Sequence, residues 1–570
     1  MNAETFCEHF ATFADAPNGV ARLRQMVMQL AIQGRLVPQD TKEKPADSLI
    51  ADIAKFKAAA TGRETQIVEL DATAAGFPLP SGWAAVAFGD IMLNRDGERI
   101  PVSRDIRDGR KGPYDYYGAS GVIDSIDDFL FDKSLLLIGE DGANLINRST
   151  PIAFIAHGKY WVNNHAHVLD GISLEFLKYI ELYINAIDLK PYVTGTAQPK
   201  MNQAKMNSIV VALPPLAEQR RIVEKVDQLL GLCDELAARQ AAQREKRQRL
   251  VGATLDRLVS PQTSRHLACR GGLTASAPFD ENTTGAKANE PPGQARWRVM
   301  QDDAHRLRNH FDQLFDTPTT IPQLRQTILQ LAVQGKLVPQ DPSEVPTDVP
   351  ASSSLAASKR DRDIPFEIPA NWKWMKLGQV SELINGDRSK NYPNRAEYVP
   401  EGVAWINTGH IEPDGTLSTE SMHFITRKKF DSLRSGKVRL GDLVYCLRGA
   451  TLGKTAIISQ YEEGAVASSL VIIRLHPAVV PRFAYHVLTS PLGRAQIFQF
   501  DNGSAQPNLS ANSVKKYWIP LPPPAEQKRI VTKVTELLSL CDALEAKLTQ
   551  AESASTQLLS AAVHHLLQKP

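Results

Sequence analysis

The chain contains an internal duplication. In each of the two copies, near-identical segments at the start and at the end, which we call the edges of the copy, enclose a divergent middle block. Residues 23–40 and 324–341 match at 13 of 18 positions with an offset of 301. Residues 214–238 and 522–546 match at 17 of 25 positions with an offset of 308. A period near 300 residues is far longer than the ~20–50 residues of a solenoid repeat. The sequence therefore indicates duplication of a whole module. The near-identical edges are expected to have the same role in both copies, and the divergent middle blocks are expected to have two different roles of the same kind.

Both edges of each copy predict helices. Residues 23–34 carry apolar side chains at helical spacing, and Gly34 followed by Pro38 predicts that this helix ends there. The later edges start with paired prolines and continue as apolar seams with alternating spacings of four and three, which is the a/d pattern of packed helices. Cys233 and Cys541 fall on the seams, where we expect them to act as small buried apolar residues.

The two seams differ at their far ends. In the first copy the seam meets Gln240, Gln243 and Arg247, so we expect it to pack less well there, whereas Leu548 and Ala551 extend it in the second copy. Helices of ~40 residues would each be roughly 60 Å long. Antiparallel packing of the two seams is the simplest way to bury both, and it would place the two middles at opposite ends of a rod.

The middle blocks contain short apolar runs bounded by Gly, Asp or Pro, at 135–138, 152–155, 443–445 and 470–473, which are typical of strands. We therefore predict an α+β fold: two globular mixed α/β domains separated by two long antiparallel helices that form a coiled-coil spacer, with pseudo-twofold symmetry. The first copy is predicted to contain a repeated helical segment at 1–76, a first middle domain at 77–213 and a first spacer helix at 214–258. A flexible linker follows at 259–305. The second copy is predicted to contain the second helical segment with a linker at 306–365, a second middle domain at 366–521 and a second spacer helix at 522–570.

The composition is that of an ordinary soluble protein. The chain has 570 residues, 43% apolar and 22% charged, with a net charge of +2 that favours no class of partner. Five cysteines without a CxxC pair exclude a disulfide framework and a cysteine-based zinc site, and favour a reducing compartment. No stretch has the ~18 apolar residues of a membrane span, and the first residues do not resemble a secretory signal. We expect a cytoplasmic protein without membrane contact.

No pattern in the sequence supports catalysis. Residues 449–455 resemble a phosphate-binding loop, but only three residues separate the glycines where the motif requires four. His165 and His167 have a spacing that can bind metal, but no second ligand cluster accompanies them, so packing is favoured over ligation. We therefore expect no catalytic residue and no metal site in this chain.

Basic and aromatic residues cluster in the middle blocks. Residues 95–111 of the first block carry six Arg and Lys residues, and tyrosines follow at 114, 116 and 117. Residues 77–213 have 13 basic and 16 acidic residues, whereas residues 366–521 have 18 and 13. Arg and Lys can hold phosphates, and Arg, Asn and Gln can read base edges. The acidic balance of the first block means that nucleic-acid contact there would depend on local geometry.

A duplicated frame around two different blocks resembles the specificity subunit of type I restriction–modification systems. The likeness is carried by residues 23–39 and 324–340, by the Gly-Thr/Ser-Ala-Gln-Pro segments at 195–199 and 503–507, and by the Pro-Pro-x-Ala-Glu-Gln-x-Arg-Ile-Val segments at 214–223 and 522–531. Residues 116–121 and 139–144 also look like motifs of that family's target recognition domains.

The resemblance implies a non-catalytic DNA-binding subunit that recognises a bipartite site on double-stranded DNA. It also implies a scaffold for two methyltransferase subunits, which methylate adenine N6, and for restriction/translocase subunits. The chain itself would need no cofactor, because S-adenosylmethionine, ATP and Mg would be held by those partners. The first middle domain would read one half-site and the second middle domain the other.

We assign candidate contacts on charge and loop context, since base-contacting residues in this family vary with the target. The expected DNA-binding residues are Arg95, Arg99, Arg107, Lys111, Arg388, Lys390, Arg448 and Lys454, together with Gln198 and Gln506, for which a structural turn is an equal alternative. The outer faces of the long helices are expected to bind partner subunits through Arg220, Arg221, Lys225, Lys528, Arg529 and Lys533.

Two other classes of function fit the sequence less well. The chain would be a scaffold whose duplicated domains bind polypeptides, if no DNA binding were found with the partners present. It would be an enzyme with an unrecognised site, if the isolated chain transferred methyl groups or cleaved DNA. The repeated architecture and the missing catalytic motifs favour the DNA-binding subunit.

Overall fold

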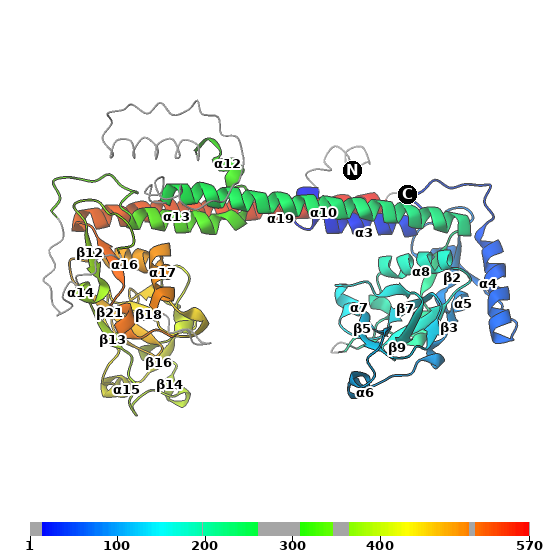
Figure 1. Cartoon of the computed structure of the whole chain (residues 1–570), viewed down its shortest axis with the longest axis horizontal. Coiled ribbons are helices and arrows are strands. Elements are labelled where there is room, and N and C mark those ends of the chain that lie inside the picture. Colours follow the sequence, from blue (N-terminus) through cyan, green and yellow to red (C-terminus); the bar gives the residue numbers. More distant parts are fainter. Residues whose placement is uncertain (1–13, 196–197, 260–307, 346–363, 501–507, 569–570) are drawn as a thin grey trace. The chain divides into compact units, whose positions relative to one another are not determined.

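The computed structural model describes residues 14–195, 198–259, 308–345, 364–500 and 508–568 (Figure 1). These residues form two compact units. Unit 1 contains the chain up to Arg244 together with the last segment from Ala551, and unit 2 runs from Glu245 to Gln550. Most of the predicted linker at 259–305 lies outside the described residues.

Unit 1 begins with the helices α3 (Gly19–Ile32) and α4 (Ala46–Thr61). Its middle domain has three sheets. In sheet order these are β1-β2-β11, then β3-β10-β7-β8, then β5-β4-β9-β6. The strands are β1 (Glu69–Leu70), β2 (Ala84–Ala87), β3 (Leu93–Asn94), β4 (Tyr114–Gly118), β5 (Gly121–Ile126), β6 (Phe131–Asp132), β7 (Leu135–Gly139), β8 (Ala153–Ala156), β9 (Lys159–Val162), β10 (Ala166–Asp170) and β11 (Val210–Leu213). The helices are α5 (Phe88–Ile91), α6 (Arg104–Asp108), α7 (Asn144–Asn147), α8 (Leu174–Ala186) and α9 (Gln203–Asn207).

Unit 2 repeats this plan. Its sheets are, in sheet order, β12-β22, then β13-β21-β18-β19, then β14-β16-β15-β20-β17. The strands are β12 (Lys373–Lys376), β13 (Ser381–Asn385), β14 (Tyr398–Val399), β15 (Val403–Ile406), β16 (His423–Ile425), β17 (Lys437–Val438), β18 (Leu443–Cys446), β19 (Thr455–Ile457), β20 (Gly464–Val466), β21 (Leu470–Leu475) and β22 (Trp518–Leu521). The helices are α12 (Phe311–Leu314), α13 (Ile321–Val333), α14 (Leu377–Val380), α15 (Arg427–Ser432), α16 (Pro481–Thr489), α17 (Pro491–Phe500) and α18 (Ala511–Val514).

The two middle domains have matching topologies although their sequences diverge. In each, a four-stranded antiparallel sheet has a strand late in the sequence next to the first strand, β10 beside β3 and β21 beside β13. In each, a second sheet contains one parallel pair, β4 with β9 and β15 with β20. The predicted α+β class with two mixed domains is therefore confirmed, and the four predicted apolar runs form β7, β8, β18 and β21.

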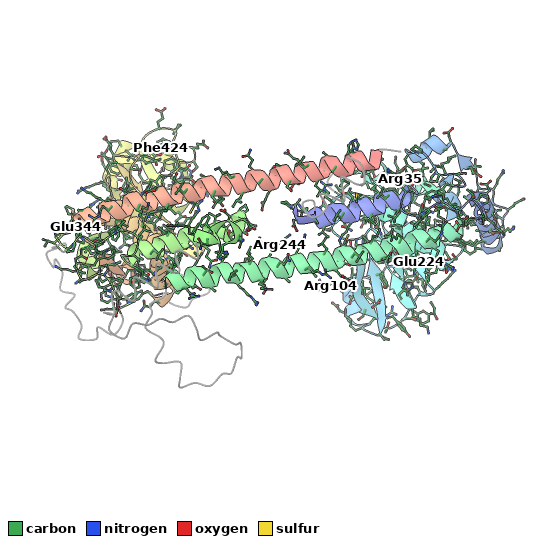
Figure 2. The ribbon with its side chains drawn as sticks, turned by 90° about the horizontal axis from the view of Figure 1, so that it is seen from above. Arg35, Arg104, Glu224, Arg244, Glu344 and Phe424 are labelled. Atoms are coloured by element: carbon green, nitrogen blue, oxygen red, sulfur yellow. The ribbon has the colours of Figure 1, made fainter. Side chains whose placement is uncertain are left out.

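The predicted long helices are α10 (Leu216–Val259) and α19 (Pro524–Gln568). In unit 1, Cys233 of α10 packs in one buried cluster with Leu559 and Val563 of α19 and with Leu23 of α3. In Figures 1 and 2, α3 lies alongside the first part of α10, and α13 lies alongside its last part. In unit 2, Val251 of α10 belongs to the same core as α13. Cys233 and Cys541 are buried as expected.

The far ends of the seams differ from the sequence prediction. Gln240 does not weaken packing in unit 1: it is buried, and its side-chain amide donates to the carbonyl of Ala14 and the carboxylate of Asp15. In α19, Ala551 is exposed rather than on the seam, and burial resumes at Leu559. A strict heptad pattern does not anticipate these changes because α3 and the segment before it, not a second long helix alone, cover this face.

A buried carboxylate joins the repeated edges in each unit. Glu218 is 1% exposed and accepts hydrogen bonds from Trp83 Nε1 at 3.0 Å and from Gln39 Nε2 at 2.7 Å. Unit 2 repeats the arrangement at the same distances, with Glu526 accepting from Trp372 and Gln340. Burial raises the pKa of both glutamates, against the opposing effect of these hydrogen bonds. The carboxylate thus ties the start of the long helix to the segment that follows α3 or α13 and to the residue just before β2 or β12.

The turn after α3 is packed against the same tryptophan. Gly34 has φ +68°, and a Cβ there would lie 2.4 Å from Pro80 Cγ and 3.0 Å from Trp83 Cζ2. In unit 2, Gly335 has φ +69°, and a Cβ would lie 2.4 Å from Pro369 Cγ. Only glycine fits both the left-handed backbone and the close approach. This explains physically why the sequence after both helices is the same.

Replacing Glu218 with alanine should lower the free energy of unfolding by about 2 kcal/mol or more, since the buried indole N–H of Trp83 would lose its acceptor. Chemical denaturation followed by fluorescence measures this change. Glu224→Ala is a matched control because Glu224 is exposed on the same helix (Figure 2). Equal stability of the two variants would contradict the role given to the carboxylate.

Two glycine substitutions should have opposite signs. Gly34→Ala is expected to destabilise by more than about 1 kcal/mol, because alanine disfavours positive φ and its Cβ would clash with Pro80. Gly231 lies inside α10 with open space around its Cβ position, so Gly231→Ala is expected to stabilise by up to about 1 kcal/mol. Thermal unfolding of both variants checks the prediction, and a stabilising Gly34→Ala would refute it.

Candidate nucleic-acid interface

The loops with the most basic residues lie at one edge of the four-stranded sheet in each unit. In unit 1, β3 and β7 both pair antiparallel with β10, so their carboxyl ends meet at the same edge. In unit 2, β13 and β18 both pair antiparallel with β21 and likewise end together. We call these the unit 1 edge and the unit 2 edge. The residues just after these strands are therefore brought together although they are about 45–60 positions apart in the sequence.

At the unit 1 edge the predicted arginines are engaged within the domain. Arg95 contacts Glu98 at 2.8 Å and Asp170 at 3.4 Å. Arg99 is 14% exposed, contacts Glu140 at 3.3 Å and donates to the carbonyl of Ala166 at 2.7 Å. These guanidinium groups tie the loop after β3 to β10 and to the residue after β7. Their part in DNA contact stays a prediction, and the geometry gives them a structural task as well.

Arg107 and Lys111 share one carboxylate. Arg107 Nε lies 3.0 Å from Asp124 Oδ2, and Lys111 also pairs with Asp124. Hydrogen bonds from Lys111 and Arg107 hold the pKa of Asp124 well below its usual range. The Arg107 guanidinium also lies 4.5 Å from the ring centroid of Tyr116, whose side chain is fully buried. Lys111 remains half-exposed, whereas Arg107 is 14% exposed.

The His165 and His167 pair is part of this packed network. His167 is buried, with Nδ1 at 2.6 Å from Asp96 Oδ2 and Nε2 at 3.1 Å from the carbonyl of Met201. Burial would raise the pKa of Asp96, but hydrogen bonds from His167 and Val168 hold it below its ordinary value. His165 contacts Asp141 at 2.8 Å. Both histidines thus bond to groups of the protein, and within the residues that the structure describes no three metal-binding side chains gather.

The unit 2 edge presents its cations differently. Arg388, Lys390, Arg448 and Lys454 are all exposed. Lys454 Nζ approaches the carbonyl of Ile411 at 3.5 Å. Arg388 and Arg448 line a polar pocket of about 250 Å³, whose other lining residues are Asn385, Leu447, Asn508, Leu509, Ser510, Ala511 and Asn512. The sequence suggested the two arginines but not the asparagines, because the segment from 508 joins the edge only through tertiary pairing.

Two glutamines were predicted at equivalent positions. Gln198 is exposed, and the carbonyl of this residue lies 2.7 Å from the Cβ position of Gly195, which has φ +83°. Gln198 therefore lies in a tight turn, and a contact of its side chain with DNA remains a prediction. Gln506 lies outside the described residues.

A family model for the type I restriction modification DNA specificity domain matches residues 80–245 and 369–552, which make up more than half of the chain. The chain belongs to this family. The match falls in two segments, one on each middle domain with part of its long helix, in agreement with the internal duplication.

Related proteins cover nearly the whole chain. The type I restriction enzyme EcoAI specificity subunit of Escherichia coli is 26% identical, over 95% of this chain and 93% of its own length. The EcoEI specificity subunit of Escherichia coli is 25% identical with the same coverage. A solved structure described as the basis of complex assembly and conformational transition of a type I R-M system covers 86% of this chain and 99% of its own, at 16% identity and a TM-score of 0.45.

This specificity subunit is the DNA-recognising, non-catalytic part of a type I restriction–modification complex, and its family carries no cofactor of its own. The candidate site is therefore an interface and not an active centre. Among the described residues, no helix combines the length and the apolar composition that a membrane span requires.

The basic residues of the long helices fall into two groups. Arg221 of the specificity subunit contacts Glu43 at 2.8 Å, and Arg529 contacts Glu344 at 3.1 Å, so both fasten the segment after the early helix (Figure 2 labels Glu344). Arg220 is 64% exposed and contacts Glu175 at 3.5 Å. The remaining three are at least partly accessible, namely Lys225, Lys528 and Lys533. Arg221 and Arg529 thus have a structural task that the sequence prediction did not assign.

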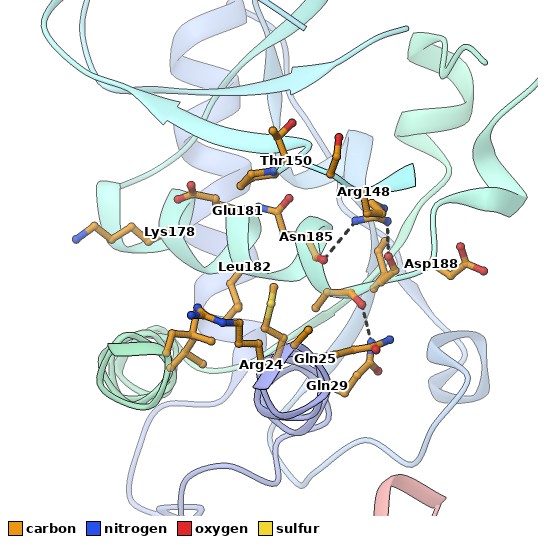
Figure 3. A pocket seen from close by; sticks show the side chains of 18 of the residues that line it. Arg24, Gln25, Gln29, Arg148, Thr150, Lys178, Glu181, Leu182, Asn185 and Asp188 are labelled. Carbon is orange, nitrogen blue, oxygen red and sulfur yellow. Dashed lines mark hydrogen bonds between the residues drawn. The ribbon is translucent and has the colours of Figure 1, made fainter. Parts of the chain in front are cut away.

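A large groove lies beside the early helix of unit 1. It has a volume of about 1050 Å³ and is lined by α3, α8, the first part of α10 and the segment from Leu145 to Pro151 (Figure 3). Arg148 closes one end by donating to the carbonyls of Asn185 and Ile187 at 3.3 and 2.6 Å. Glu181 lines the groove, and burial followed by repulsion from Asp227 raises its pKa to about 7. This groove cannot be predicted from the sequence pattern, because the residues that line it come from segments far apart in the chain.

Proposed function

We propose that the two middle domains of this specificity subunit each read one half of a bipartite DNA sequence. The observation that carries the proposal is the presence of one fold twice with different chemistry at the same edge. Glu140 follows β7 in unit 1, where Arg99 and Lys200 neutralise it at 3.3 and 3.1 Å. The next residue, Asp141, contacts His165 at 2.8 Å. Its counterpart in unit 2 is Arg448, since Asp141 and Arg448 form equivalent β-bridges, with Lys200 and Asn508 respectively. Matching scaffolds with different loops would read different bases.

The surrounding frame supports a division of labour. Phosphate contacts fix a protein on the duplex, and base-edge contacts supply the sequence information. Loops at a sheet edge can vary without disturbing the core, since the buried strands β7, β10, β18 and β21 supply the packing. The near-identical repeated segments, 23–40 with 324–341 and 214–238 with 522–546, would keep α10 and α19 in place. We propose that the length of these helices sets the number of unspecified base pairs between the half-sites.

The complex with its methyltransferase partner should protect a two-part site with an unspecified gap. Replacing residues 366–521 with the corresponding block of another specificity subunit should change one half-site only, because each domain has its own core and edge. Footprinting and sequencing of the methylated adenines measure both results. A single continuous site, or a change in both halves, would contradict the proposal.

The partner subunits fit the accessible parts of the helical frame. We propose that two methyltransferase subunits bind along α10 and α19, with Arg220, Lys225, Lys528 and Lys533 as the available cations, and that restriction/translocase subunits join the assembled complex. Adenine N6 methylation, S-adenosylmethionine, ATP and Mg would belong to those subunits. The family supports this assignment because the specificity subunit is one component of a larger enzyme complex.

The groove of unit 1 would accept a helix of the methyltransferase subunit. In unit 2, α17 packs against α13 and α16, which are the counterparts of α3 and α8, and Leu492 N donates to Gln330 Oε1 at 3.2 Å. Gln29, which is the unit 1 equivalent of Gln330, lines the open groove and donates to the carbonyl of Ala186. In unit 1 the chain after α8 forms only a three-residue 3-10 helix at Lys190–Tyr192 and no α-helix that corresponds to α17. The internal comparison thus supports a helical occupant.

Filling this groove should weaken assembly. Ala21 is exposed on α3 and lines the groove, so Ala21→Trp should occupy it without removing any buried contact. Co-purification of the methyltransferase subunit is expected to fall at least tenfold. Ala238→Trp is the control, because Ala238 is exposed on α10 and does not line the groove. Undiminished co-purification with Ala21→Trp would exclude the groove as the docking site.

A further inference from the structure

The polar pocket at the unit 2 edge has the chemistry of an anion site. We propose that Arg388 and Arg448 together hold one phosphate of the DNA backbone and so position the second middle domain on the duplex. This inference rests on the proposed function, and it adds a role for two residues whose contacts were not distinguished above. In the part of the chain that the structure describes, the two guanidinium groups form no ion pair or side-chain hydrogen bond.

The pocket is built on paired backbone. Asn385 ends β13 and faces Val471 of β21, while Cys446 ends β18 and faces Leu470, so the two loops leave neighbouring positions. The segment from Asn508 to Asn512 also lines the pocket, and it is bonded to the loop after β18. Leu509 N donates to the carbonyl of Leu447 at 2.9 Å, and Asn508 forms a β-bridge with Arg448. Both arginines therefore extend from anchored backbone. Such preorganisation reduces the entropy lost on binding.

The charge of the pocket is unbalanced. Among the described residues, those that line it include no acidic side chain. The nearest carboxylate in sequence, Asp387, is buried and accepts from the backbone N–H groups of Ser389 at 2.6 Å and Arg434 at 2.7 Å. Asn385 and Asn512 add amide donors. Two guanidinium groups with neutral donors suit the oxygens of a phosphate, which arginine binds in a bidentate manner.

The equivalent place in unit 1 has the opposite character. There the position of Arg448 is taken by Asp141, which forms the same β-bridge with Lys200 that Arg448 forms with Asn508. The preceding residue, Glu140, contacts both Arg99 and Lys200. Lys200 immediately precedes Met201, whose N–H donates to the carbonyl of Glu140 at 2.8 Å, just as Asn508 precedes Leu509 in unit 2. The unit 1 edge is thus neutralised within the protein, whereas the unit 2 edge keeps its positive charge for a ligand.

The concave shape favours a phosphate over a base. Base edges are recessed in the grooves of B-DNA, and a protein reaches them with side chains that project from its surface. The sugar–phosphate backbone is the part of the duplex that projects outward. A pocket of about 250 Å³ with two exposed arginines in its lining can receive a projecting phosphate. We therefore expect contacts that are independent of sequence.

The test compares Arg388→Ala, Arg448→Ala and the double variant in complex with the methyltransferase subunit. Affinity for the cognate site and for unrelated DNA is measured over a range of salt concentrations. Each single variant should bind about tenfold more weakly to both DNAs, because charge-assisted hydrogen bonds are lost. The slope of log affinity against log salt should fall by about one for either single variant. If one phosphate is shared, the double variant should lose little more.

Controls separate this inference from the proposed function. Arg494→Ala removes an exposed arginine of α17, which does not line the pocket, and should leave the slope unchanged. Arg448→Lys keeps the charge and should recover part of the affinity. Loss of specificity at one base position, a slope change of about two in the double variant, or no change in binding would each overturn the shared-phosphate site. A wild-type complex without cognate binding would instead overturn the proposed function.

Discussion

The buried carboxylate at the start of each long helix is the interaction on which the rest of the structure depends. Glu218 and Glu526 each receive hydrogen bonds from an indole and from a side-chain amide, and each of those donors belongs to a different segment of the chain. Leaving a buried donor unsatisfied costs about 1–3 kcal/mol, so separating any of the three segments would lower the stability of the fold by at least that amount. The glycine after the early helix strengthens this restriction, because proline and tryptophan fill the space that a Cβ would need.

This restriction explains why the duplicated chain diverges so unevenly. Residues of the frame contact one another across long sequence separations, and a change in one requires a change in two others. The loops after β7 and β18 have no such partners in common, and they differ in charge. Glu140 and Asp141 follow β7, whereas Leu447 and Arg448 follow β18 beside a polar pocket. Divergence is concentrated at the two sheet edges that we propose to read different half-sites. The physical frame and the recognition chemistry are therefore separable in this molecule.

Much of this organisation could be predicted from the sequence. The duplication, the long helices, the strands at 135–138 and 443–445 and the glycine stop of α3 depend on local patterns, and the structure confirms them. The details that failed depend on tertiary contacts. Ala551 fits the heptad but is exposed, because the segment of α19 from Leu559 onward is the one that packs beside α3. Arg99, assigned as a DNA contact on charge alone, stays a prediction, and its guanidinium also pairs with Glu140 and donates to the carbonyl of Ala166. A sequence shows which residues are charged but not which of those charges are already paired.

The cluster that contains Ala14, Ala16, Leu559 and Val563 has a consequence for genetics. It brings the segment before α3 together with the last turns of α19, so unit 1 is completed by residues that follow all of unit 2 in the sequence. A change in the codons for residues 559–563 would therefore act on the packing of unit 1, although those residues belong to the second repeat.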